Sequence, residues 1–197
     1  MASAHPPALV VIRGNSGSGK STVAREVRAR YGQGCALIEQ DYLRRIVLRE
    51  HDSGSMDPVA PAFIAATART ALDHGYHVVL EGILHADRYG TALRGLIGGH
   101  PGGTTVFYLD VSFEETVRRH TTRAAGAGFT AEDMRAWYAP RDLLGTPGEH
   151  VIGETSALPD TVTTILSLSG LAAEPPHTPC PGSCPRCAEK TRDPDRM

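Results

Sequence analysis

The sequence predicts an α/β domain of three layers, in which helices cover both faces of a doubly wound, parallel, five-stranded sheet. Short apolar runs alternate along the chain with helical stretches, as repeated β-α-β units require. The apolar runs lack the polar alternation of half-exposed strands, which indicates burial on both faces. Right-handed crossovers between such strands give a parallel sheet. The chain has 197 residues, enough for one ordinary domain with a buried core.

Apolar, β-rich runs predict the strands, and helical stretches follow them. The predicted strands comprise residues 8–13, 35–40, 77–82, 104–110 and 150–154. The predicted helices comprise residues 20–31, 41–50, 62–74, a stretch ending near 97, 113–123, a short helix after 130, and 157–170. A loop is expected over residues 52–61. Ser112 with Glu115 predicts a capping box, and Thr130 with Asp133 marks another helix start.

Composition and charge argue against several classes of protein. The formal net charge is −2, so the chain lacks the basic excess expected of proteins that bind long nucleic acids or anionic membranes. The longest early apolar run, residues 8–12, is too short for a signal-peptide core or a membrane span. Four cysteines, three of them near the C-terminus, do not resemble a secreted disulfide framework. We therefore expect a cytoplasmic protein without a membrane partner.

The chain divides at about residue 173 into a domain, residues 1–173, and a tail, residues 174–197. Six prolines among the last 24 residues end regular structure and predict a mobile tail. The tail also holds four side chains of the kind that bind zinc, namely His177, Cys180, Cys184 and Cys187. Their spacing is compressed and contains a single C-x-x-C, so a zinc site and a tail of free thiols both stay open.

Residues 14–22, GNSGSGKST, match the phosphate-loop pattern G-x-x-x-x-G-K-[ST] between a predicted strand and a predicted helix. Glycines let the backbone wrap a phosphate group at the helix N-terminus. Lys20, one of only two lysines in the chain, is expected to bridge β- and γ-phosphate oxygens, and the Ser21 hydroxyl to bind Mg²⁺. The predicted nucleotide contacts in this loop are Gly14, Asn15, Ser16, Gly17, Ser18, Gly19, Lys20, Ser21 and Thr22.

A phosphate loop alone does not identify the reaction, but two classes can be set aside. The only asparagine of the chain, Asn15, lies inside the loop, so the N-K-x-D motif that reads guanine in GTPases cannot be present. Large motor ATPases usually carry two adjacent acids after the third strand, whereas Glu81 stands alone here. The chain is also too short for the extra domains of those motors.

Acidic residues stand at the predicted carboxyl edge of the sheet, where open α/β folds bind their ligands. Asp41 follows the second strand and is predicted to accept the proton of an attacking hydroxyl; the alternative is that it only caps the next helix. Glu39 is the competing carboxylate, but strand alternation is expected to point it away from the cleft. Glu81 ends the third strand, beside the loop in the expected order 2-3-1-4-5. It either holds a Mg²⁺-bound water or binds acceptor hydroxyls, or it is an exposed acid.

Basic residues near these acids are candidates for binding the acceptor. Arg44 and Arg45 lie one turn after the predicted base, and we expect at most one of them to point inward. His85 and Arg88 follow the third strand closely enough to reach the same substrate. The predicted acceptor-binding set is Asp41, Arg44, Glu81 and His85.

The arginine-rich segment 118–142 follows the fourth strand and carries two glycines, which predicts a lid that closes over the nucleotide. Transferring phosphoryl oxygens need several charged donors, and arginine suits that task. Arg119 and Arg123 are the predicted nucleotide-side contacts, with Arg141 a weaker candidate; the alternative for each is a solvated surface position. Trp137 and Tyr138 are expected to pack rather than to stack on a base.

Four motifs together resemble a known family. They are GNSGSGKST, EQDYLRR with Asp41, VVLEGIL with Glu81, and LDVSFEETVRRHTTR leading into the predicted lid. Over about residues 8–170 the chain resembles small P-loop kinases of the zeta-toxin and chloramphenicol-phosphotransferase-like group, which are relatives of the nucleoside monophosphate kinases. The loop is specific for the P-loop NTPase superfamily, and the other motifs are weak indicators of the substrate.

The resemblance implies transfer of the γ-phosphoryl group of ATP, with Mg²⁺, to a hydroxyl of a small molecule such as a nucleoside, nucleotide sugar or antibiotic. Lys20, Asp41 and Arg123 are the expected catalytic residues. Two alternatives stay open: a kinase of polynucleotide 5′ ends, which the acidic balance disfavours, and a nucleotide-dependent binding or regulatory module with the tail as its docking element.

Overall fold

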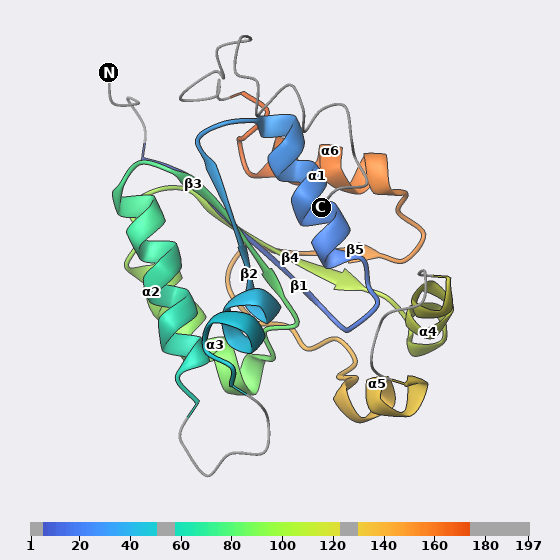
Figure 1. The fold of residues 1–197 in the computed structure, drawn as a ribbon. Helices are drawn as coiled ribbons and strands as arrows, with labels where there is room; N and C mark the ends of the chain where they lie inside the picture. Colours follow the sequence, from blue (N-terminus) through green and yellow to red (C-terminus); the bar gives the residue numbers. More distant parts are fainter. Residues whose placement is uncertain (1–5, 51–57, 123–129, 174–197) are drawn as a thin grey trace, which may run out of the picture.

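The computed structural model describes residues 6–50, 58–122 and 130–173 of the chain. Its centre is a sheet of five parallel strands (Figure 1) in the order β2-β3-β1-β4-β5, which confirms the predicted fold class and strand order. The strands are β1 (Leu9–Gly14), β2 (Cys35–Glu39), β3 (His77–Gly82), β4 (Thr104–Asp110) and β5 (Glu149–Gly153). Each lies within about two residues of a predicted strand.

The two inner strands β1 and β3 are buried along their whole length, as their unbroken apolar sequences predicted. Successive residues of β1 face opposite layers, so Leu9 and Val11 enter one core and Val10 and Ile12 enter the other. The edge strand β5 is only partly buried. Burial therefore fixes β1, and with it the position of the loop that follows β1, most firmly.

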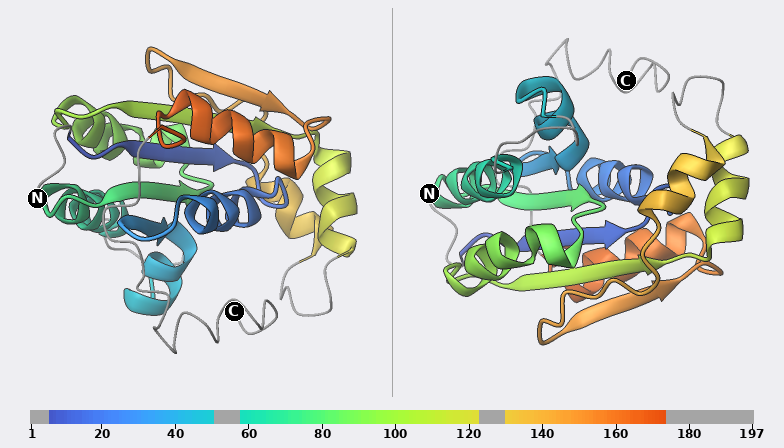
Figure 2. Two further views of the ribbon diagram at one scale, coloured as in Figure 1. Left: turned by 90° about the horizontal axis from the view of Figure 1, so that it is seen from above. Right: turned by 90° about the horizontal axis from the view of Figure 1, so that it is seen from below.

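Helices cover the sheet on both sides. They are α1 (Lys20–Tyr31), η1 (Tyr42–Val47), α2 (Ala60–Asp73), α3 (Ala86–Gly98), α4 (Phe113–Thr121), α5 (Ala131–Trp137) and α6 (Leu158–Leu168). Helices α1 and α6 lie on one face and α2 and α3 on the other, whereas α4 and α5 lie beyond the end of the sheet (Figure 2). Among the described residues, no helix has the length and apolar content needed to cross a bilayer.

The helix predicted over residues 41–50 is shorter than expected and forms a π-helical turn, η1. The amide of Leu48 donates to the carbonyl of Leu43 at 2.9 Å, one residue wider than an α-helical bond. The extra residue in the turn brings Arg44 inward while Arg45 stays exposed. Such turns occur often at functional sites. This one follows directly after the strand that ends at Glu39.

One predicted capping box is present and the other is half formed. Thr130 and Asp133 exchange hydrogen bonds between side chain and backbone at the start of α5. At the start of α4 the Ser112 hydroxyl accepts from the amide of Glu115, but the reciprocal bond is absent because Glu154 accepts from the Ser112 amide at 2.9 Å instead. The Glu115 carboxylate binds two arginines of its own helix. The prediction of a full box at Ser112 was therefore wrong.

Candidate active site

The phosphate loop joins the end of β1 to the start of α1, as predicted. Gly14, Gly17 and Gly19 have φ of 146°, 81° and 96°, a region that other residues rarely adopt. A Cβ atom on Gly14 would lie 2.7 Å from the Leu109 carbonyl oxygen, and one on Gly17 would lie 2.6 Å from the Thr116 carbonyl oxygen. Glycine is therefore required here both for the turn and for the close approach of β4 and α4.

Lys20 lies inside this loop and is buried. Its Nζ donates to the carbonyl oxygen of Asn15 at 2.8 Å and lies 3.5 Å from the Ser18 hydroxyl. These bonds hold the ammonium group across the loop, at the N-terminus of α1, where the free amides of a helix favour an anion. The arrangement can bind a polyphosphate.

Glu81 is buried, with 4% of its surface exposed, and lies beside the phosphate loop. The Ser21 hydroxyl donates to Glu81 Oε1 at 3.1 Å. Burial raises the pKa of Glu81 above its usual range, opposed by the charge of Lys20 and by the Ser21 hydrogen bond. The interpretation of Glu81 as a solvent-exposed acid is therefore wrong. A hydroxyl and a buried carboxylate at this distance are oxygen donors of the kind that suit Mg²⁺.

Glu39 lies beside Glu81 on the neighbouring strand and forms an ion pair that the alternation argument did not predict. It is in register with Glu81 on the neighbouring strand, so both side chains leave the same face of the sheet. Arg25 of α1 pairs with Glu39 Oε1 at 2.7 Å. This ion pair, rather than a direction away from the cleft, distinguishes Glu39 from a candidate base.

Asp41 lies just beyond the end of β2, at the carboxyl edge of the sheet. It occupies the N-cap position of η1, yet its side chain accepts no capping hydrogen bond. Its carboxylate is 64% exposed and lies 3.4 Å from Arg45 Nε. The structure therefore gives no hydrogen-bonded capping role to Asp41 and leaves its carboxylate accessible to a ligand.

Arg44 and Arg88 both approach the carboxylate of Glu50. Arg88 Nη2 binds Glu50 Oε1 at 2.9 Å, and Arg44 Nε lies 3.9 Å from that oxygen. The other oxygen of Glu50 accepts from the amides of Val59 and Ala60 at the start of α2. Arg44 is the buried member of the Arg44–Arg45 pair, in keeping with the expectation that at most one points inward. The contacts tie η1, α2 and α3 together on the predicted acceptor side.

Arg13, the residue before the phosphate loop, is fully buried and was not among the predicted site residues. Its guanidinium donates to the Leu84 carbonyl at 2.8 Å and 3.1 Å and binds Asp142 at 3.0 Å and Glu149 at 3.2 Å. Leu84 has a φ of 47° and is also buried. One buried cation thus fixes the chain just before His85.

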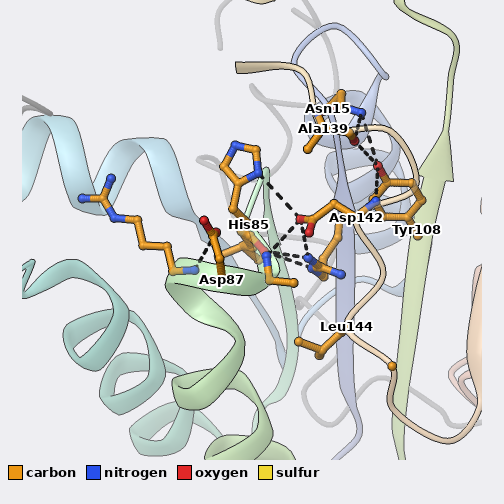
Figure 3. A network of polar contacts seen from close by, with 12 residues as sticks. Asn15, His85, Asp87, Tyr108, Ala139, Asp142 and Leu144 are labelled. Atoms are coloured by element: carbon orange, nitrogen blue, oxygen red, sulfur yellow. Dashed lines mark hydrogen bonds and ion pairs between the residues drawn. The ribbon is translucent and has the colours of Figure 1, made fainter. Parts of the chain in front are cut away.

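The side chain of Asn15 binds protein groups in this structure. Its amide oxygen accepts from the amide of Ala139 at 2.9 Å, and its Nδ2 donates to the Ala139 carbonyl at 2.9 Å and to the Tyr108 hydroxyl at 3.2 Å (Figure 3). Tyr108 in turn donates to the Ala139 carbonyl. The phosphate loop is thereby joined to the C-terminal end of the predicted lid segment 118–142.

A cavity of about 550 Å³ opens beside the loop, on the side away from Asp41. Residues of the loop, of α4 and of the turn after β5 line it, among them Gly17, Thr22, Arg119, Glu154 and Ala157. Arg119 donates to the Ser18 carbonyl at 3.2 Å and to the Glu154 carbonyl at 2.9 Å.

Hydrogen bonds from Arg118 and Arg119 lower the pKa of Glu115 to about 2, so the Glu115 carboxylate stays ionised beside these two arginines. Arg119 therefore lies beside the phosphate loop and lines this cavity, and its contact with a nucleotide stays a prediction.

Several predicted residues are not placed. Arg123 and the four zinc candidates His177, Cys180, Cys184 and Cys187 lie outside the described residues, as does most of the loop predicted over 52–61. Within the ranges that are described, no group of three or more His, Cys, Asp and Glu side chains has the arrangement of a metal site. Arg141 lies 3.9 Å from Asp110, and the Tyr138 hydroxyl donates to the Val111 carbonyl.

Arg13, Tyr108 and Asp142 carry most of the buried network and were missed by sequence reasoning. Tyr108 lies within a predicted strand and Asp142 at the end of the predicted lid, where neither has a motif around it. The one available signal is an arginine, Arg13, within an otherwise apolar buried strand, since a buried charge needs partners. That signal indicates a network but does not identify its members.

Fold and loop together define the chain as a P-loop NTPase of the kinase fold. A family model described as AAA domain matches residues 9–140, and the chain belongs to this family. No curated protein sequence matches the chain at a significant level.

Solved structures of kinases share the fold. The APS kinase CysC of Mycobacterium tuberculosis, in complex with AMPPNP and APS, aligns with a TM-score of 0.65 and 18% identity, covering 83% of this chain and 98% of that one. A sugar kinase from Janibacter sp. has a TM-score of 0.64 and 19% identity, covering 85% and 96%. A gluconokinase from Sinorhizobium meliloti has a TM-score of 0.59 and 21% identity, covering 97% and 99%.

Proposed function

We propose that this protein is an ATP-dependent kinase that transfers the γ-phosphoryl group to a hydroxyl of a small molecule. The observation that carries the proposal is the placement of three groups along one edge of the sheet. A nucleotide-sized cavity lies on one side of the phosphate loop, Ser21 and Glu81 meet beside it, and the accessible carboxylate of Asp41 follows the end of β2. Open α/β sheets bind ligands at this edge.

The nucleotide would lie with its phosphates on the loop and its base in the 550 Å³ cavity. Lys20, buried in the loop, would place a positive charge on the β- and γ-phosphate oxygens. Arg119, held by two backbone carbonyls, would bind the nucleotide from the α4 side. Arg123 stays a predicted contact to the transferring group.

Ser21 and Glu81 are the residues that would hold Mg²⁺, the first directly and the second through bound water. The ion, when bound, supplies positive charge that offsets the charge of the phosphates. For the chain itself, the buried Glu81 fixes the Ser21 hydroxyl at the N-terminus of α1, beside the phosphate loop. Burial disfavours the charged form of the Glu81 carboxylate, and a cation nearby would stabilise that form.

Asp41 would orient the acceptor hydroxyl and accept its proton as the oxygen attacks phosphorus. The P–O bond to ADP breaks as the bond to the acceptor oxygen forms, and ADP leaves. Little covalent chemistry is asked of the protein, so positioning dominates the rate. Arg44 of η1, which follows β2, and His85, which follows β3, would contact the acceptor.

The compared structures support a small hydroxylated acceptor, because their names describe kinases of APS, of a sugar and of gluconate. The EQDYLRR and VVLEGIL motifs further lead us to propose the zeta-toxin and chloramphenicol-phosphotransferase-like group as the subgroup. The proposal places the protein in the cytoplasm, where ATP is available.

The test is ADP release from Mg-ATP by the purified full chain, screened against nucleosides, nucleotide sugars, aminoglycosides, gluconate and other sugars. We expect one class to stimulate release, and we expect Lys20→Ala and Asp41→Asn to abolish the stimulation while Asp41→Asn still binds ATP. Glu39→Gln is the matched control, since it neutralises the carboxylate two residues away and should keep the activity. Stimulation that survives in Asp41→Asn but is lost in Glu39→Gln would reassign the base.

A separate arm uses a single-stranded oligonucleotide with a free 5′ hydroxyl. Labelling of that end, with steeply salt-dependent binding, would overturn the small-molecule proposal in favour of a polynucleotide kinase. Tight ATP binding without release in any arm would favour a binding or regulatory module.

A further inference from the structure

One oxygen of Asp142 connects the phosphate loop's strand to the acceptor side. Asp142 Oδ2 accepts from Arg13 Nη2 at 3.0 Å and from the amide of Ala86 at 2.9 Å, and it lies 3.6 Å from Nδ1 of His85 (Figure 3). Arg13 belongs to β1, whereas His85 and Ala86 begin α3. The three contacts converge on this atom from residues that lie more than 50 positions away along the chain.

The carboxylate is held in place more firmly than the imidazole. Arg13 is fully buried, and its charge is shared with Glu149, whose side chain is also buried. The amide of Ala86, at the start of α3, has no acceptor within its own helix and donates to the Asp142 carboxylate instead. His85 makes the longest of the three contacts and has 31% of its side chain exposed. Asp142 therefore acts on His85, rather than the reverse.

A carboxylate beside one ring nitrogen determines where the imidazole proton lies. A lone pair on Nδ1 would face the negative oxygen of Asp142 and be repelled, whereas an N–H there is attracted. The proton on Nδ1 leaves Nε2 as a hydrogen-bond acceptor. Among the described residues, none donates a hydrogen bond to Nε2 of His85. In Figure 3 the second ring nitrogen of His85 lies on the side of the ring away from Asp142.

We propose that Asp142 is a positioning residue of the acceptor site: its carboxylate keeps the proton of His85 on Nδ1, so that Nε2 accepts a hydrogen bond from a hydroxyl of the phosphoryl acceptor. The hydrogen bond from the acceptor to Nε2 rests on the proposed kinase function, whereas the position of the His85 proton on Nδ1 does not. Asp142 does not touch the reacting atoms; it acts through His85.

The first experiment reads the tautomer directly and needs neither nucleotide nor acceptor. Long-range ¹H–¹⁵N correlation spectra of the ¹⁵N-labelled full chain are recorded at about pH 8.5, well above the ordinary histidine pKa of about 6.5. The His85→Gln variant identifies the His85 signals by their absence. We expect the proton on Nδ1 in the wild type, and a shift of population to the Nε2–H form in Asp142→Asn. A wild-type ring with its proton on Nε2 overturns the proposal.

Glu149→Gln is the matched control. This substitution neutralises the other carboxylate that binds Arg13, so it removes a buried ion pair comparable to that of Asp142. Glu149 does not face His85, because its oxygens bind Arg13 and the amides of Leu144 and Gly145. We expect the His85 tautomer in this variant to equal that of the wild type. A tautomer shift of the same size in both variants means that loss of the buried network, not the Asp142 carboxylate, determines the state of His85, and it overturns the proposal.

The second experiment measures kinetics with the compound of the ADP-release panel that gives the largest stimulation. We expect Asp142→Asn to raise KM for that compound about tenfold, the loss of one well-placed hydrogen bond, and to raise KM for ATP by a smaller factor. Glu149→Gln should leave the acceptor KM within about twofold. An unchanged acceptor KM in Asp142→Asn overturns the acceptor role. Absence of transfer with every compound contradicts the proposed function and leaves the spectroscopic result standing.

Discussion

The Tyr108 hydroxyl is the polar centre of the network behind the phosphate loop, and its removal gives a sharp test of the structure. The hydroxyl accepts from Asn15 Nδ2 at 3.2 Å and from the amide of Asp142 at 3.3 Å, and it donates to the Ala139 carbonyl at 3.2 Å. Burial raises the pKa of Tyr108 above its usual range, so the hydroxyl keeps its proton at neutral pH. The substitution Tyr108→Phe deletes this one oxygen and keeps the ring.

The loss of stability in Tyr108→Phe depends on which former partners of the hydroxyl keep another hydrogen bond. Asn15 and Ala139 still bind each other at 2.9 Å, so two of the three groups keep a hydrogen bond. The amide of Asp142 has no other hydrogen bond within the described part of the chain. This donor is partly buried, and leaving it unsatisfied costs about 1.5 kcal/mol. For a protein of this length that corresponds to a fall in Tm of between about 3 and 6 °C.

Thermal unfolding followed by circular dichroism measures this change. Tyr138→Phe is the control, because among the described residues its hydroxyl bonds only to the Val111 carbonyl, at 3.1 Å, and a smaller loss of about 0.5–1 kcal/mol is expected. A Tyr108→Phe protein whose Tm lies within about 1 °C of the wild type, or equals that of the control, would refute the assignment of Tyr108 as the centre of the network.

Three further predictions concern the site itself. Gly17→Ala should abolish ATP binding, because the added Cβ meets a backbone oxygen at 2.6 Å. Gly75→Ala is the control, since Gly75 has a similar φ of 82° and open space around it; this substitution should lower stability by about 1 kcal/mol and leave ATP affinity unchanged. Titration calorimetry measures both affinities. Arg119→Ala should weaken ATP binding about tenfold, whereas the exposed Arg118→Ala should stay within about threefold. The raised pKa of Glu81 means that the folded state holds this proton more tightly, so its contribution to stability is present below about pH 4.5 and is lost as pH rises through the folded pKa. The free energy of urea unfolding of wild type relative to Glu81→Gln should therefore decrease over that interval, and an increase would contradict the burial argument.

The fold was predictable because its signals are local. The apolar runs of the inner strands and the glycine spacing of residues 14–22 place β1, α1 and β3 without knowledge of the rest of the chain. Asp41 and Glu81 could be located for the same reason, since each directly follows or ends such a run. Strand order then brings Glu81 beside the loop.

The network behind the loop was not predictable, because its members come from five separate segments. Arg13 is satisfied by Leu84, Asp142 and Glu149, and none of these contacts leaves a local pattern. The ion pair of Glu39 was not predicted either, because alternation within one strand says which face a residue leaves, but not that α1 brings Arg25 to meet it.

Asn15 and Arg119 together have a consequence for how this protein can change. Arg119 holds the end of α4 to the Ser18 carbonyl, and Asn15 holds the peptide of Ala139, so a stretch of about twenty residues begins and ends on the same loop. Its ends are brought together by those bonds, whatever the length between them. Helix α5 lies within this stretch, and its buried Met134 packs beside Gly17 of the loop. A movement of the phosphate loop would therefore be passed on to α5 both through this packing and through the hydrogen bonds at the two ends.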